Sequence, residues 1–70
     1  MDINDIVTLE ELKKEFNKPN VIGSVFDTKD NICYDLKENV TSSKKFYLRK
    51  VETALIVDTW LYNIFIEPVE

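Results

Sequence analysis

The last third of the chain constrains the fold most, because residues 46–66 contain neither glycine nor proline. A single strand of that length would run about 70 Å at ~3.3 Å per residue, which is too long for a domain of this size. Many residues of the segment are β-branched, which favours strands. We therefore expect two strands with a break near Arg49–Thr53, the second strand being long and bulged near Asp58. A helix over residues 52–63 is the alternative.

The two faces of an extended 51–66 segment differ in polarity. The odd positions, from Val51 to Phe65, carry no charge, and we expect them to form the core face. The even positions are also largely apolar, which is unusual for the exposed face of an antiparallel sheet. We expect a partner to cover this second face, unless a kink buries Trp60 in the core. The residues assigned to this partner-binding surface are Ile56, Asp58, Trp60, Tyr62 and Ile64.

Residues 8–17 have the pattern of a short amphipathic helix. Thr8 and Glu11 have the spacing of a capping box, in which each side chain satisfies a free backbone N–H at the helix start. Val7 and Leu12 stand where a hydrophobic staple would lie. Only three apolar side chains form the stripe of this helix, so we expect the helix to pack on something larger.

Two further runs, 21–27 and 32–36, are rich in β-branched and aromatic residues and flank the turn-favouring residues 28–31. This pattern predicts a β-hairpin. The chain is thus predicted to be a single α+β domain over residues 1–70, in which one short N-terminal helix packs on a small antiparallel sheet of about four strands. The polar stretch 37–45 is predicted to be a loop.

Composition excludes several kinds of chemistry. The chain has no histidine, one cysteine and one glycine. Familiar zinc sites and histidine-based triads therefore cannot be built within one chain, and a phosphate-binding glycine loop is also excluded. We expect no enzyme activity, metal, cofactor or small-molecule substrate. The longest apolar runs, of four residues, are too short for a membrane span. A lone Cys33 fits a reducing cytoplasm, where we expect the chain to reside.

These features predict a small module that binds another protein, or a second copy of itself as a homodimer. The contact would use the apolar sheet face or an unpaired edge strand. Small, acidic, glycine-poor chains, here with a net charge of −4, are common among accessory and inhibitor proteins of bacteriophages. We expect a role of that type, although no motif matches a particular family.

A nucleic-acid-related role is the alternative. In a strand, Lys45, Tyr47 and Arg49 would project from one face and resemble a stacking platform for single-stranded nucleic acid. The net charge of −4 weighs against this role, because phosphate contacts need a basic surface. The other form of the alternative is acidic mimicry of DNA. The carboxylates that would imitate phosphates are Asp27, Asp30, Asp35 and Glu38.

Overall fold

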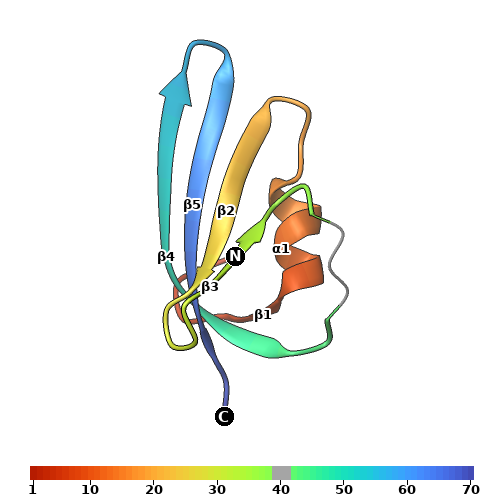
Figure 1. Cartoon of the computed structure of the whole chain (residues 1–70), viewed down its shortest axis with the longest axis vertical. Helices are drawn as coiled ribbons and strands as arrows, with labels where there is room; N and C mark the ends of the chain where they lie inside the picture. Colours follow the sequence, from red (N-terminus) through yellow and green to blue (C-terminus); the bar gives the residue numbers. More distant parts are fainter. Residues whose placement is uncertain (39–41) are drawn as a thin grey trace.

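A computed structural model describes residues 1–38 and 42–70 of the chain (Figure 1). The middle of the predicted polar loop, residues 39–41, lies outside the described ranges. Within those ranges the chain forms one helix, α1 (Leu9–Phe16), and five strands. The strands are β1 (Ile6–Thr8), β2 (Val21–Asp27), β3 (Ile32–Asp35), β4 (Lys45–Ile56) and β5 (Thr59–Pro68).

The predicted capping box of the helix is confirmed. The Thr8 Oγ1 atom accepts a hydrogen bond from the backbone N–H of Glu11 at 3.2 Å, and the Thr8 N–H donates to Glu11 Oε1 at 3.2 Å. These two bonds fix the start of α1 within one residue of the predicted start. Leu9 and Leu12 are buried and Phe16 packs against the same core, so α1 lies on the sheet through its apolar stripe as expected.

The five strands form one sheet in the order β1-β4-β5-β2-β3. The predicted α+β class with a single short helix and a small sheet is confirmed, but the sheet has five strands and is mixed. Strands β2 and β5 are parallel, whereas the other neighbours are antiparallel. A parallel pair needs a long connection between its strands. Residues 28–58, which contain β3 and β4, provide that connection.

The chain reverses later than the sequence predicts. The break expected near Arg49–Thr53 is instead a bulge, where the pairing of β4 with β5 shifts between Leu48 and Lys50. The reversal itself is a two-residue turn at Val57–Asp58, closed by the pairing of Ile56 with Thr59. The helical alternative over residues 52–63 is therefore wrong.

This turn changes which side chains face the core. Odd residues of β4 beyond the bulge lie opposite even residues of β5, as Val51 lies opposite Ile64. In β5 the fully buried side chains are Ile64 and Ile66, both even-numbered. In the distal half of β4 the predicted odd core face is correct only for Val51, which packs against the core, because Thr53 and Leu55 lie on the same face but are exposed. The prediction is wrong for β5, because a two-residue turn exchanges odd and even positions between the strands it joins.

The core is built from one face of the sheet, from α1 and from the residue that follows β3. The fully or nearly fully buried apolar residues are Val7, Leu9, Leu12, Val21, Val25, Leu36, Phe46, Leu48, Ile64 and Ile66. On the opposite face, within the described residues, no helix covers the sheet. There the rings of Phe26 and Phe65 stack with centroids 5.3 Å apart, and the Lys50 ammonium lies 5.9 Å from the centroid of the Phe65 ring.

Candidate functional site

The β4–β5 hairpin extends past the end of the helix. Helix α1 has 8 residues, about 12 Å at a rise of ~1.5 Å per residue, whereas the longest dimension of the molecule is 39 Å. Phe16, the last residue of α1, contacts Tyr62 with ring centroids 5.1 Å apart. Residues of the hairpin between Tyr62 and the turn project beyond this contact, and Figure 1 shows the end of the hairpin standing clear of α1.

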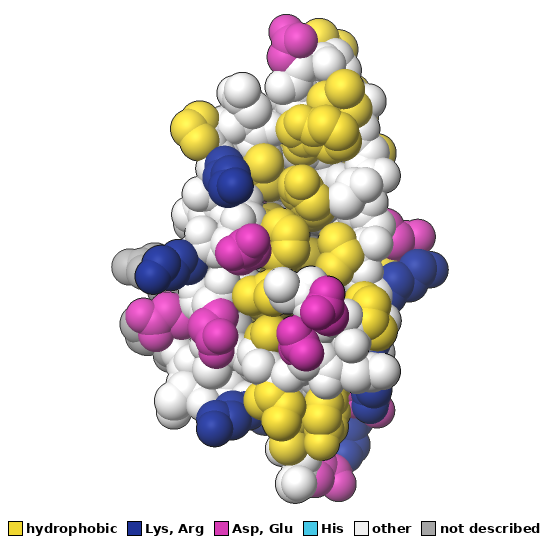
Figure 2. All heavy atoms as spheres, turned by 180° about the vertical axis from the view of Figure 1, so that it is seen from behind, with side chains coloured by type: hydrophobic (Ala, Val, Ile, Leu, Met, Phe, Trp, Pro, Cys, Tyr) yellow, Lys and Arg dark blue, Asp and Glu magenta, His cyan; other side chains and the backbone are white. Residues whose placement is uncertain are grey.

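Large apolar side chains gather at this projecting end. Four of them are exposed: Leu55 (56%), Ile56 (55%), Val57 (87%) and Trp60 (43%). We call these four residues the apolar tip. In Figure 2 a broad apolar patch occupies the upper end of the molecule, with a single acidic group at its extremity. Scattered exposed apolar residues are common in monomers, but a group of this kind marks an interaction site.

The apolar tip is accessible from both sides of the hairpin. Leu55 and Trp60 are cross-strand partners and share the face on which α1 packs further down the sheet. Ile56, opposite Thr59, lies on the other face. Asp58 is the only charged residue between Thr53 and Ile66, so the end of the hairpin carries little charge. A partner that enclosed the end of the hairpin would therefore desolvate one carboxylate at most.

The backbone of Val57 is strained. Its φ angle is +56°, in a region that β-branched residues rarely occupy. Val57 is the first residue of the two-residue turn, where a type II′ hairpin normally carries glycine. A residue held in such a conformation costs about 1–3 kcal/mol. Because the Val57 side chain is the most exposed of the apolar tip, packing within the monomer does not compensate for this cost.

Three of the five residues assigned to the partner-binding surface lie at the end of the hairpin: Ile56 and Trp60 in the apolar tip, and Asp58 in the turn. The fourth, Tyr62, is half-buried against the core. The assignment of Ile64 is wrong, since its side chain is fully buried. Burial of Ile64 follows from the same exchange of odd and even positions at the turn.

The alternation in the sequence predicts core positions for two residues of the apolar tip, Leu55 and Val57, and this prediction is wrong. The run Leu55–Val57 followed by Asp58 contains none of the glycine, asparagine or proline residues that announce a tight turn. A two-residue turn centred in this run would have placed both residues at an exposed end. The only signal for it in the sequence is Asp58, the single charge within a long uncharged segment.

The predicted stacking platform for nucleic acid consists of Lys45, Tyr47 and Arg49, and Arg49 and Tyr47 already make contacts within the chain. Arg49 lies 4.8 Å from the centroid of the Tyr47 ring, and its Nε atom donates to Glu67 Oε2 at 2.8 Å. A second guanidinium nitrogen of Arg49 donates to Asn4 Oδ1 at 2.6 Å. Lys45 is exposed where β4 pairs with β1. Arg49 occupies one face of the Tyr47 ring, and Glu67 neutralises the charge of Arg49. The platform therefore presents less aromatic surface and less positive charge to a nucleic acid than the sequence indicates.

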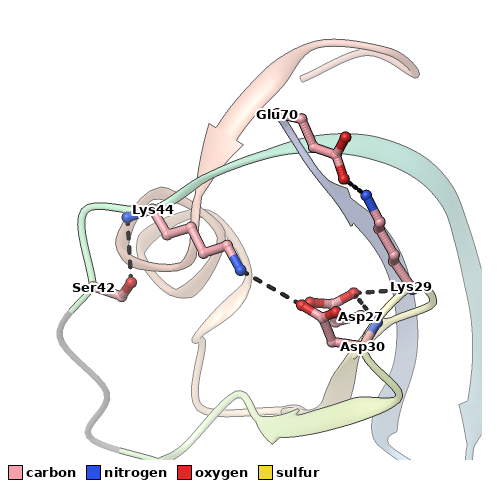
Figure 3. Close-up of polar contacts among 6 residues, drawn as sticks. All are labelled: Asp27, Lys29, Asp30, Ser42, Lys44 and Glu70. Atoms are coloured by element: carbon pink, nitrogen blue, oxygen red, sulfur yellow. Dashed lines mark hydrogen bonds and ion pairs between the residues drawn. The ribbon is translucent and has the colours of Figure 1, made fainter.

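The acidic residues around the β2–β3 turn do not form an exposed array. Asp27 is buried, and its Oδ1 atom accepts hydrogen bonds from the N–H groups of Lys29 and Asp30, each at 3.0 Å (Figure 3). Asp30 in turn pairs with Lys44 at 3.6 Å. Asp27 therefore holds the turn and cannot imitate a phosphate, whereas Asp35 and Glu38 remain exposed.

Neither a metal site nor a membrane span is found in the described part of the chain. Residues 1–38 and 42–70 contain no group of three side chains suited to hold a metal ion, and Cys33 is exposed in β3. Over the same ranges, no helix has the length and apolar character that crossing a bilayer requires.

Comparison of the chain with protein-family models, with curated proteins and with solved structures finds no match in any of the three.

Proposed function

We propose that this chain is a small, non-enzymatic protein-binding module and that the apolar tip is its contact surface. The observation that supports the proposal is the group of four exposed apolar side chains at the end of a projecting hairpin. Full burial of one side chain of this size contributes roughly 1.5–3 kcal/mol. Burial of the exposed parts of these four side chains would favour a complex, and tryptophan is among the residues most often found at the energetic centre of interfaces.

The shape of the tip specifies the partner's surface. A convex, apolar end that is accessible from both faces fits a concave apolar groove, and Asp58 in the turn fits a basic group at the bottom of that groove. Insertion into a groove of a larger protein is a suitable mode of action for an inhibitor or accessory protein of phage type. A cytoplasmic location also stays a proposal, supported by the single free thiol.

The strain at Val57 supports the same proposal. A valine that is exposed and held at a φ of +56° lowers stability without contributing to the packing of the monomer. Strained residues of this kind cluster where a protein contacts its ligand.

The experiment compares three proteins as bait in extracts of the native host. The first is the natural chain, and the second is the double variant Leu55→Thr and Val57→Asn. Both replacements are polar, and asparagine tolerates the positive φ at position 57. The matched control is Ile3→Thr with Ile32→Thr, because both isoleucines are about as exposed as Leu55 but lie away from the apolar tip.

We expect a protein that the natural chain and the control retain and that the tip variant loses, with all three baits folded by circular dichroism. Measured with the purified partner, affinity should fall at least ~30-fold, which corresponds to about 2 kcal/mol. Equal retention and equal affinity for all three baits would contradict the proposal.

A further inference from the structure

The outer edge of β4 is paired along only half of its length. Strand β1 pairs with residues 45–47. The preceding segment then adds two bonds at Leu48, whose N–H donates to the carbonyl of Asp5 at 2.9 Å and whose carbonyl accepts from the N–H of Asn4 at 2.6 Å. Beyond Arg49, no strand of the described residues pairs with β4 on this side. Figure 1 shows the upper half of β4 at the margin of the sheet.

The hydrogen bonds of β5 identify which backbone groups face the open edge. The N–H of Trp60 donates to the carbonyl of Asn20 at 2.8 Å and therefore points away from β4. Leu55 lies opposite Trp60, so this pair is a non-hydrogen-bonded pair of the antiparallel ladder. The N–H and C=O of Leu55 consequently point outward. By alternation along the strand, those of Thr53 and Val51 do the same.

This edge has few of the features that normally block strand pairing. Residues 50–56 contain no proline, and the bulge lies before them. The two charged residues of the segment, Lys50 and Glu52, pair with each other at 3.5 Å. A long edge with exposed aliphatic side chains and unpaired backbone groups is a template for an added strand.

We propose that a second copy of this chain adds to the open edge, with the residues 50–56 of the two copies antiparallel and the two-fold axis passing beside Thr53. The limits of the edge fix this register. The open segment runs from Lys50, just past the bulge, to Ile56, just before the turn, and Thr53 is its midpoint. In this register the whole segment pairs, and the pairing ends before Leu48, which is bonded to the N-terminal segment.

The side chains are self-complementary in the same register. Val51 of one copy faces Leu55 of the other, and Thr53 faces Thr53, which are favourable cross-strand pairs. Glu52 faces Ala54. A two-fold axis beside Glu52 would set two carboxylates directly opposite each other, which is destabilising. Axes beside Val51 or Ala54 would leave part of each open segment unpaired. A closed, isologous dimer results, with one continuous ten-stranded sheet.

This inference goes beyond the proposed function and does not require it, although Leu55 and Ile56 belong to both the open edge and the apolar tip. The tests are also separate. The capture experiment measures a foreign partner, whereas self-association is measured on the purified chain alone.

The experiment is sedimentation equilibrium of the purified chain over micromolar to millimolar concentrations. We expect a reversible dimer. Thr53→Pro removes a donor that the monomer does not use, because the N–H of Thr53 faces the open edge, so this variant should fold and stay monomeric. Thr53→Lys and Thr53→Glu, which set like charges opposite each other, should each weaken association at least ~10-fold. Ser43→Lys, which adds the same charge in an exposed position away from the edge, should dimerise normally.

The register is tested by mixing the lysine and glutamate variants. Because position 53 faces itself, the mixture should form a heterodimer where each variant alone does not. Amide hydrogen exchange provides a second readout: Val51, Thr53 and Leu55 should gain protection with concentration, whereas Glu52 and Ala54 should not. A natural chain that is monomeric throughout, a dimer that Thr53→Pro and Thr53→Lys leave intact, or a mixture that does not associate would overturn the proposal.

Discussion

Val57 holds the first position of the β4–β5 turn at a φ of +56°, a conformation that glycine adopts without steric cost. Val57→Gly should therefore raise the free energy of unfolding by about 1 kcal/mol, the net of a relieved strain of roughly 1–3 kcal/mol and the ~0.5–1 kcal/mol entropic cost of glycine. Chemical denaturation measures this change. Ile56→Gly, in the extended strand beside it, should instead be destabilising.

The same Val57→Gly substitution should weaken partner binding, because it removes the most exposed apolar side chain of the apolar tip. Stability and affinity would then move in opposite directions. A variant that is less stable than the natural chain would show that Val57 contributes to folding in a way that its exposure does not explain.

The hydroxyl oxygen of Thr8 stabilises the start of α1 because it accepts a hydrogen bond from the N–H of Glu11. Thr8→Ala leaves the N–H of Glu11 without that acceptor and should cost about 1 kcal/mol. In a domain of this size the melting temperature should fall by roughly 4–8 °C, measured by thermal circular dichroism. Glu11→Gln preserves both bonds of the capping box and should change the melting temperature much less. Equal effects of the two substitutions would mean that the charge of Glu11, rather than the box, stabilises the helix.

At the scale of the elements, the parallel pairing of β2 with β5 depends on the only glycine of the chain. Gly23 is paired with Tyr62, and a Cβ atom at this position would collide with the Tyr62 carbonyl oxygen and lie 3.1 Å from Leu36 Cδ1. The oxygen belongs to the backbone of a central strand and cannot move away without separating β2 from β5.

Gly23→Ala should therefore destabilise the domain by about 2–3 kcal/mol, the upper range for an overpacked site. Ser24→Ala, one residue further along the same strand, is the control and should have a small effect. Urea denaturation of both variants measures the difference. If Gly23→Ala were as stable as the control, the close approach of the two strands would be relaxed in solution.

The elements that the sequence predicts well are those with local signals. Thr8 and Glu11, which lie within one turn of each other, predict the helix, and four turn-favouring residues predict the β2–β3 hairpin. The β4–β5 turn has no such signal, because a valine occupies a position that normally requires glycine. The parallel pair could not be predicted either, since its partners are distant in the sequence and no local pattern records their pairing.

The candidate site, too, can be predicted only in part from the sequence. The sequence pattern predicts an exposed surface that contains Ile56, Trp60 and Ile64. Ile56 and Trp60 are exposed, whereas Ile64 is buried. The error has a single origin, since the position of one turn decides the orientation of every later side chain in β5. Leu55 and Val57 could be placed at the tip only once that turn was known.

At the scale of the whole molecule, the core and the apolar tip lie at different distances from α1, and local stability should follow this gradient. In dilute solution, the amides of β4 and β5 near the turn should exchange faster than those beside Ile64 and Ile66, because they are backed by less buried apolar surface. Native-state hydrogen exchange resolves the two groups. Uniform protection along both strands would indicate that the hairpin unfolds only together with the core.

The order of the strands in the sheet also has a consequence for synthesis on the ribosome. Strand β5 lies between β4 and β2, so it joins the β1–β4 half of the sheet to the β2–β3 half. It is also the last strand of the sheet to leave the ribosome. Until then the two halves have no common neighbour, and the nascent chain carries unpaired strand edges and apolar side chains in contact with solvent. Productive folding must therefore wait for β5, and the distant pairing with β2 makes that step slow relative to helix formation.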